Sequence, residues 1–464
     1  MQKLATLCCA LLLSSSFAVP VLAANPVKTD MKAMSQSLRA AANPPPAWKD
    51  YFTDPRLQQL IALALDNNRD LRMATLAIEQ ARAQWQIQRS AQWPQIGLGA
   101  NAARAPNSSG NLSNTYSVGG ILSAWELDFF GRLGSLKEQA LAQYLASEEG
   151  RNAAQTSLIA AVASAWLALQ ADEEGLDISR RTLATREESL ALMKLRLDVG
   201  TASELDYRQV QSLTEAARVT LAQQQRQRAL NENALALLLG QPLPPELRAS
   251  LPGSRLVQVP SMAALPAGLP SDLLAHRPDI RQAELQLKAA NANIGAARAA
   301  FFPRISLTAQ AGTASSELSE LFKSGTWAFS PTLSALLPIF DAGRNQAGLQ
   351  AAQAGRDMAV AQYEKSIQSA FREVSDALAS QGTLDEQLRA SQAQLQAEQA
   401  RLRLAQLRYD NGVASYLDLL DAQRSLFSLE QAVVQVRLQQ LQNQVQLYKA
   451  LGGGWPAPEA QALL

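Results

Sequence analysis

The chain has 464 residues, of which 47% are hydrophobic, and its 42 basic and 41 acidic side chains leave a net charge of +1. The length and composition suffice for a packed core, while the balanced charge and the lack of a long basic block argue against a nucleic-acid partner. Aromatic residues make up only 6%, and the long middle stretches are rich in Ala, Leu, Gln and Arg, which is typical of extended helices packed side by side.

Residues 1–23 form a predicted secretory signal peptide. Lys3 precedes an apolar run, and VLA at 21–23 is a small-residue cleavage site. Both cysteines, Cys8 and Cys9, lie inside this segment, so we expect no disulfide, thiolate metal site or cysteine nucleophile in the mature chain. Lipidation of either cysteine is the less favoured alternative, because the apolar run before them is short. No later stretch offers the roughly 18 consecutive apolar residues of a membrane-spanning helix.

The rest of the chain is a tandem duplication. Residues 195–240 align without gaps on 407–452 at an offset of 212, and WPQIGL at 93–98 pairs with FPRISL at 302–307 at an offset of 209. We therefore divide the chain after the signal peptide into four segments. These are a first repeat (24–240), a Pro-rich linker (241–270), a second repeat (271–452) and a C-terminal tail (453–464).

Each repeat has the same predicted plan, which is a helix, two strands separated by a polar loop, a very long helix, a turn and another long helix. The first helices span 71–90 and 280–300. No proline occurs between Pro106 and Pro242, or between Pro338 and Pro456, so long helices are permitted there. A helix over 344–409 would reach about 100 Å at about 1.5 Å per residue, which is too long for a compact domain.

The last helix, which starts at Ser415, has two apolar tracks with spacings of three and four residues. One begins at Leu417 and Leu420 and ends at Tyr448, and the other begins at Leu419 and Ala422. Two tracks imply a helical neighbour on each side, as in a sheet or cylinder of helices. A wide core-facing stripe in a globular bundle is the alternative.

The predicted strands have a period of two. Apolar and polar residues alternate over 96–102, 304–311 and 327–339, whereas the phase changes within 113–127 and predicts a β-bulge there. Two strands per repeat give four per chain. A sheet that spans a membrane must close, and known barrels begin at about eight strands. Several chains must therefore share one barrel.

Aromatic residues gather where the predicted strands meet helices, as they do at a membrane interface. An ordinary aromatic core at a sheet edge is the alternative. The residues assigned to the interface are Trp93, Trp125, Phe129, Phe301, Phe302 and Phe340.

Several motifs in this order resemble the TolC-like outer membrane efflux channels, particularly the branch that pairs with resistance-nodulation-division (RND) pumps. They include WELDFFGR at 125–132, HRPDIRQAE at 276–284, PIFDAGR at 338–344 and YDNGVASYLDLLDAQ at 409–423. The resemblance implies a mainly α fold with a transmembrane β-barrel. It implies a homotrimer with a twelve-stranded barrel, four strands coming from each chain, and a trimeric α-barrel that forms a periplasmic tunnel. The N-terminal segment before the first helix, the linker and the tail would form an equatorial belt.

The resemblance also implies the function and the partners. The chain would be the passive exit channel of a tripartite efflux system in the bacterial outer membrane. Its partners would be outer membrane lipids, a periplasmic adaptor protein and an inner-membrane RND transporter. A channel for type I protein secretion is the alternative, and a non-conducting periplasmic scaffold is a third possibility. The single histidine, His276, and the absence of a Gly-rich phosphate loop or metal-spaced motif argue against an enzyme, a cofactor or a metal site.

Both turns carry residues that end one helix and cap the next. Gly200 and Gly412 each follow a long helix, where a positive φ is needed. Ser203 and Ser415 then begin the next helices, with Asp206 and Asp418 three residues later, which predicts a capping box at each turn.

Asp421 has no such local explanation, because its counterpart in the first repeat is Gln209. In a threefold ring Asp421 and Asp418 would place like charges at the narrow end of the tunnel, and the resemblance likewise places an aspartate of LLDAQ at the periplasmic constriction. We therefore expect a cation-sensitive gate there, with a solvated surface aspartate as the alternative. The resemblance adds Tyr409 and Asp206 as residues that join neighbouring hairpins.

An arginine that relatives carry two residues after the second turn glycine is Ala414 here, so this lock is expected to be weaker or built differently. The small side chains of the turns suit close approach by an adaptor hairpin. The expected adaptor contacts are Val199, Gly200, Thr201, Ala202 and Ser203 in the first turn, and Asn411, Gly412, Val413, Ala414 and Ser415 in the second.

Overall fold

A computed structural model describes residues 46–106, 110, 112–260, 262–263 and 277–453. All of them belong to the second of two units in the chain, Pro44–Leu464. The predicted signal peptide, His276 and nearly all of the C-terminal tail lie outside the described residues.

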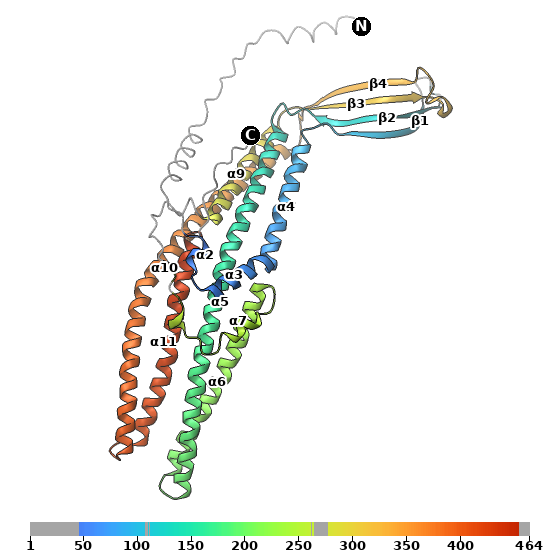
Figure 1. Cartoon of the computed structure of the whole chain (residues 1–464). Coiled ribbons are helices and arrows are strands. Elements are labelled where there is room, and N and C mark those ends of the chain that lie inside the picture. Colours follow the sequence, from blue (N-terminus) through green and yellow to red (C-terminus); the bar gives the residue numbers. More distant parts are fainter. Residues whose placement is uncertain (1–45, 107–109, 111, 261, 264–276, 454–464) are drawn as a thin grey trace. The chain divides into compact units, whose positions relative to one another are not determined.

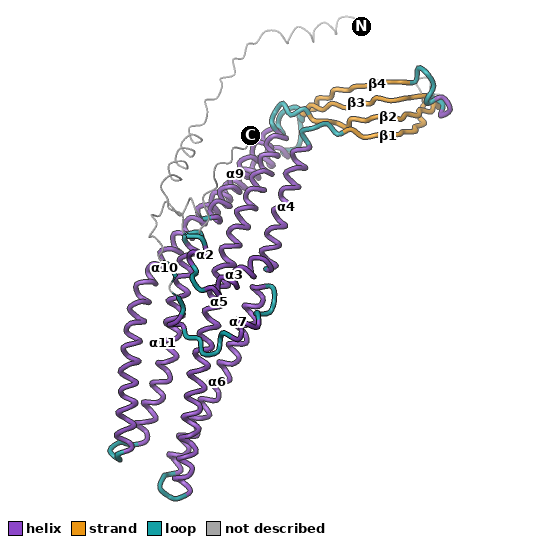
Figure 2. Tube along the Cα trace, in the orientation of Figure 1, coloured by secondary structure: helices purple, strands orange, loops and turns teal. Residues whose placement is uncertain are grey.

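The two repeats contain the same elements in the same order (Figures 1 and 2). In the first repeat they are α4 (Arg69–Ser90), β1 (Ile96–Pro106), β2 (Leu112–Glu126), α5 (Arg132–Asp198) and α6 (Glu204–Leu239). In the second they are α9 (Pro278–Ala299), β3 (Arg304–Ser315), β4 (Trp327–Leu336), α10 (Arg344–Asp410) and α11 (Tyr416–Ala450). The short elements are α2 (Trp48–Tyr51), α3 (Pro55–Asn67), α7 (Pro245–Ala249), η1 (Leu256–Gln258) and η2 (Leu318–Glu320).

The predicted long helices are present. Helices α5 and α10 each contain 67 residues, which corresponds to about 100 Å of helix. One stretch of α5 is long and apolar enough to cross a membrane by length and composition, contrary to expectation, but half of it is buried inside the structure. We assign this apolar stretch to helix packing, because α5 contacts α3, α4, α6, α9 and α11.

Helix α11 has the two neighbours that its two apolar tracks predict. It packs against both α10 and α5, and Figure 1 shows α10 and α11 running side by side. Leu420, Val434 and Tyr448 of the first track are buried, as are Leu419 and Ala422 of the second. Leu417 is the exception, with 61% of its surface exposed.

The four strands form one antiparallel sheet in the order β1-β2-β3-β4. The predicted bulge in the second strand exists and lies between Leu122 and Trp125, where Ala124 has a φ of 38°. Among the described residues, β1 and β4 each pair on one side only. Leu98 on β1 is 85% exposed and Leu333 on β4 is 67% exposed, so apolar side chains of both edge strands are uncovered in a single chain.

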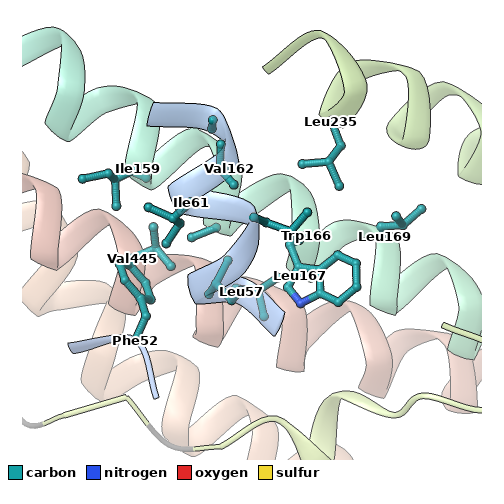
Figure 3. Close-up of a cluster of buried hydrophobic side chains, with 14 of the residues drawn as sticks. Phe52, Leu57, Ile61, Ile159, Val162, Trp166, Leu167, Leu169, Leu235 and Val445 are labelled. Atoms are coloured by element: carbon teal, nitrogen blue, oxygen red, sulfur yellow. The ribbon is translucent and has the colours of Figure 1, made fainter. Parts of the chain in front are cut away.

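The main core lies where both repeats meet the N-terminal segment. Helix α3 packs against α5 and α6, and Figure 3 shows its side chains Leu57 and Ile61 pointing toward Trp166 of α5 and Val445 of α11. These residues are at most 3% exposed. Burial of large apolar side chains stabilises such a cluster by about 1.5–3 kcal/mol each, so this core fixes the positions from which the two long hairpins extend.

Candidate functional site

The turn at the end of each hairpin is held by its backbone and by a capping box. Gly200 and Gly412 have φ values of 73° and 72°, which confirms the predicted left-handed residues. The Ser203 hydroxyl accepts a hydrogen bond from the backbone N–H of Asp206 at 3.1 Å, and the Asp206 carboxylate accepts one from the Ser203 backbone at 3.3 Å. The same reciprocal pair forms in the second turn between Ser415 and Asp418.

A contact between the two repeats joins the hairpins just above these turns. The guanidinium of Arg196, near the end of α5, donates a hydrogen bond to the hydroxyl of Tyr409 on α10. The same guanidinium lies 5.6 Å from the centre of the Tyr409 ring. The Tyr409 ring in turn lies 5.1 Å from the ring of Tyr416. Within the single chain Tyr409 is therefore bound to Arg196 of the other hairpin, while Asp206 is engaged in its own capping box with Ser203.

A small apolar cluster lies at the same joint. Met193, Val210 and Leu420 are buried together, and Tyr416 packs against them from the second hairpin. Ala202 also packs against this cluster, so its side chain is part of the fold and not simply a free contact surface.

Asp421 is held by two arginines. Arg401 of α10 and Arg424 of α11 each donate a hydrogen bond of 2.6 Å, one to each oxygen of the Asp421 carboxylate. Arg401 also pairs with Glu398 at 2.7 Å. The hydrogen bonds from Arg401 and then Arg424 hold the pKa of Asp421 below its ordinary value. Asp421 is thus a fully paired, ionised carboxylate, and the single chain does not present it as an isolated negative charge.

The remaining tip residues are mostly accessible. Val199 is 65% exposed and Val413 is 68% exposed. Thr201, Ser203, Asn411 and Ser415 are also exposed, whereas Ala414 is half-buried. Apolar side chains that project at both turns leave a surface on which a partner could bury area.

The predicted interface aromatics lie at the junctions between strands and helices. Trp93, Phe129 and Phe340 are 69%, 70% and 90% exposed. Trp125 is half-buried, and its indole N–H donates to the carbonyl of Gln92 at 3.2 Å. Phe130, in the same aromatic group, stacks on Phe302 with the ring centres 4.9 Å apart. Phe301 is also partly exposed, at 40%.

Two functional candidates were missing from the sequence prediction, namely Arg196 and Arg401. Arg401 could have been found, because it and Asp421 lie equally far from Asn411, the first residue of the predicted hairpin turn. Arg196 had no comparable signal, since the repeat aligns it with Arg408 and aligns Tyr409 with Leu197. Within the described ranges, no group of three or more His, Cys, Asp or Glu residues is placed to hold a metal ion.

Comparison with known sequences identifies one family over most of the chain. The outer membrane efflux protein family matches residues 60–241 and 269–453. The probable efflux pump outer membrane protein SepC of Pseudomonas putida is 50% identical over 425 residues, covering 90% of this chain and 87% of SepC. The outer membrane protein OprJ of Pseudomonas aeruginosa is 46% identical over 417 residues, covering 88% of this chain and 86% of OprJ.

Solved structures agree with this similarity. The open state of the Neisseria gonorrhoeae MtrE outer membrane channel superposes with a TM-score of 0.79 at 44% identity, covering 88% of this chain and 91% of that one.

Proposed function

The chain belongs to the outer membrane efflux protein family, and from this premise we propose that three copies close a shared twelve-stranded barrel and a continuous helical tunnel. As a member of this family the chain is an outer membrane efflux component, which transports and does not catalyse. Beyond the trimer, we propose a gate at the hairpin tips and two partners, a periplasmic adaptor protein and an inner-membrane transporter. Export of a folded or unfolded protein becomes the less favoured alternative.

The unpaired edges of the four-stranded sheet are the observation that supports a trimer. A lipid bilayer cannot satisfy the unpaired backbone groups at the edges of β1 and β4. Four strands are too few to close a barrel, which needs about eight or more. Pairing of β4 in one copy with β1 in the next satisfies both edges, and three copies supply twelve strands.

We place the gate at the hairpin tips. In a trimer, Asp421 would recur three times around the axis, each time accompanied by Arg401 and Arg424. The gate would therefore be a ring of alternating charges, with Asp418 next to it in its capping box. Such a ring favours cations less than a ring of bare aspartates does.

The partners follow from the family. We propose that the tip residues bind a periplasmic adaptor protein, which links the channel to an inner-membrane RND transporter. The relatives named for their substrates include a toluene efflux pump outer membrane protein, TtgF, and a solvent efflux pump outer membrane protein, SrpC, both from Pseudomonas putida. We propose small apolar molecules as the cargo of this channel too.

The test combines particle mass with conductance. Native mass spectrometry of the detergent-extracted protein is expected to give three chains, and planar-bilayer recording is expected to give currents that rise on Asp421→Ala substitution. The Glu398→Ala variant is the matched control, because it removes a partner of Arg401 and leaves Asp421 in place. A monomer, or a trimer without any current in either variant, would refute the channel and leave a scaffold.

A further inference from the structure

The pairing register of the sheet assigns its side chains to two faces of different chemistry. Residues directly opposite each other on neighbouring strands point to the same face, and side chains alternate between the faces along each strand. One face is mainly apolar, and we call it the apolar face. It includes Leu98, Val118, Leu122, Leu307, Phe329 and Leu333.

The other face of the sheet is mainly small and polar. It includes Ser117, Ser306, Thr308, Gln310, Ser330 and Thr332. A transmembrane barrel turns its apolar face to the lipid and its polar face to the lumen. In the proposed barrel the apolar face therefore lies against the lipid.

One charged residue of the described strands lies on the apolar face. Arg104 of β1 pairs directly with Asn114 of β2, and Tyr116 lies on the same face two residues further along β2. The other charged residues of these strands, Arg304 and Glu126, lie on the polar face, where the Arg304 guanidinium donates to the Glu126 carboxylate at 2.7 Å. Arg104 thus differs from Arg304 in both its position and its lack of a carboxylate on the same face.

Arg104 lies near the end of the sheet that is remote from the helices. Helices α4, α5, α9 and α10 all join the strands at one end, which holds Ile96, the first residue of β1. Arg104 is the ninth of the eleven residues in β1, and a tilted strand of about 9–11 residues spans the hydrocarbon core. Because the helices extend into the periplasm in the proposed assembly, Arg104 lies at the depth of the outer-leaflet headgroups.

Aromatic residues at the same end of the apolar face support this depth. Trp327, the first residue of β4, is 69% exposed. Its ring stacks on that of Phe329 with the ring centres 6.5 Å apart. Exposed tryptophan rings are most stable where the hydrocarbon meets the headgroups.

The side chain of Arg104 has no partner within the described chain. It is exposed, as is Asn114, while Tyr116 is half-buried, and none of the three side chains forms a hydrogen bond or ion pair with a described residue. Directly opposite residues have Cβ atoms about 4.5–5.5 Å apart, and diagonal neighbours lie about 7–8 Å apart. A guanidinium, an amide and a phenol, all of which can donate hydrogen bonds, are therefore within reach of one ligand.

We propose that Arg104, Asn114 and Tyr116 bind the phosphorylated glycolipid of the outer leaflet, lipid A, through one of its phosphates. This inference rests on the proposed barrel and identifies the lipid that the barrel binds. A guanidinium forms paired hydrogen bonds with a phosphate, and the hydroxyls of the lipid A sugars offer acceptors to Asn114 and Tyr116. The acyl chains would lie along the apolar face, where Leu98 is 85% exposed.

Titration of the intact protein with lipid A tests the site. Native mass spectrometry of the detergent-solubilised trimer should show up to three bound lipid A molecules, one for each chain. Arg104→Gln should weaken this binding by about tenfold, because it removes hydrogen bonds to a charged group. Arg104→Lys, which keeps the charge and loses the paired geometry, should have an intermediate affinity and provides the measurement if Arg104→Gln does not assemble.

Lys323→Gln is the matched control. It removes one positive charge near the same end of the sheet, but the Lys323 ammonium already pairs with Glu320 at 2.6 Å. The control should therefore bind lipid A as the wild type does. Equal weakening in Arg104→Gln and Lys323→Gln, or in neither of them, would overturn the site.

The choice of lipid separates the sources of the phosphate. Lipid A without its phosphates should bind the wild type about as weakly as intact lipid A binds Arg104→Gln, and inorganic phosphate should not displace intact lipid A. Phosphatidylglycerol that bound as tightly as lipid A would overturn the assignment to the glycolipid. A conducting trimer that bound no lipid A would overturn this inference alone, whereas a monomeric wild type would overturn the proposed function.

Discussion

Arg277 in the second repeat performs the task that Asn68 performs in the first, at positions related by the offset of 209. The Asn68 side-chain amide donates a hydrogen bond of 2.9 Å to the carbonyl of Leu238, at the end of α6. A guanidinium nitrogen of Arg277 donates one of 2.9 Å to the carbonyl of Ala450, at the end of α11. Each therefore ties the start of one helix to the last turn of another.

The two clamps differ in strength. Arg277 is 5% exposed and also binds Asp279 at 2.6 Å and Glu373 of α10 at 2.7 Å. Its guanidinium thus joins α9, α10 and α11, whereas the neutral Asn68 caps α4 and reaches α6 alone. The second hairpin is held at its base by charge, which compensates for the sparse burial along α10.

We predict that Arg277→Ala loosens the second hairpin at its base. The substitution leaves two carboxylates and one carbonyl without their donor, and hydrogen bonds to charged groups contribute about 1.5–3 kcal/mol. Hydrogen exchange should therefore become faster in the last turns of α11 and at the start of α9. Asn68→Ala is the control and should accelerate exchange at α4 and α6 only. Equal acceleration in both repeats would argue against separate clamps.

The contact of Arg196 with Tyr409 gives a second prediction. A hydrogen bond together with a cation–π contact contributes about 1–2 kcal/mol, which corresponds to a shift of roughly 5- to 30-fold in the balance between closed and open tips. Arg196→Ala should therefore raise the ratio of open to closed channels in bilayer recordings by roughly 5- to 30-fold. Tyr409→Phe, which keeps the ring and loses the acceptor, should have a smaller effect.

Asp206→Asn is the control for that experiment. Asp206 does not contact Tyr409 in the structure, and its loss weakens only the capping box with Ser203. If Asp206→Asn opened the channel as much as Arg196→Ala does, the contact through Arg196 would not be what holds the hairpins together.

The sequence predicted the elements of this fold well, because their signals are local or repeated. Glycines with positive φ and the serine caps act within a few residues, and the proline-free runs permit the long helices. Because the chain is duplicated, each element could be predicted from two stretches of sequence. The partners of Asp421 show the limit. Arg424 is three residues away on the same helix, so the pair could be read from spacing. The pair with Arg401 could be found only by laying the two helices of the predicted hairpin against each other, whereas the contact of Arg196 depends on the packing of one hairpin on another.

Burial of Asp172 predicts a dependence of stability on pH. Burial raises the pKa of this carboxyl to about 6 from its ordinary 3.8, although Asn231 donates it a hydrogen bond of 2.6 Å. The folded chain therefore binds a proton more tightly than the unfolded chain does. This contribution to stability is complete below about pH 4 and is lost as the pH rises through about 6.

Asp172→Asn should remove this part of the pH dependence and raise the melting temperature at pH 7.5 more than at pH 4. Circular dichroism of the detergent-solubilised protein at both pH values measures the difference. Burial also raises the pKa of Glu149, so the wild type should keep some dependence from that residue. The same change in melting temperature with pH in both proteins would show that Asp172 does not titrate in this range.

The sheet depends on two glycines that face each other across β2 and β3. Gly119 pairs with Gly312, and a Cβ atom on Gly119 would lie 2.3 Å from the carbonyl oxygen of Ala311, while one on Gly312 would lie 2.2 Å from that of Val118. Backbone atoms cannot move aside as a flexible side chain can. An alanine at either position must therefore push the two strands apart and weaken their hydrogen bonds.

We predict that Gly119→Ala and Gly312→Ala each reduce the amount of trimer in the outer membrane, measured on semi-native gels of membrane fractions. Gly97→Ala on β1 is the matched control, because a Cβ atom there meets nothing within 4 Å. β2 and β3 come from different repeats, so this pairing joins the two halves of the sheet. If Gly119→Ala assembled as well as Gly97→Ala, the close approach of these strands would not be required for the barrel.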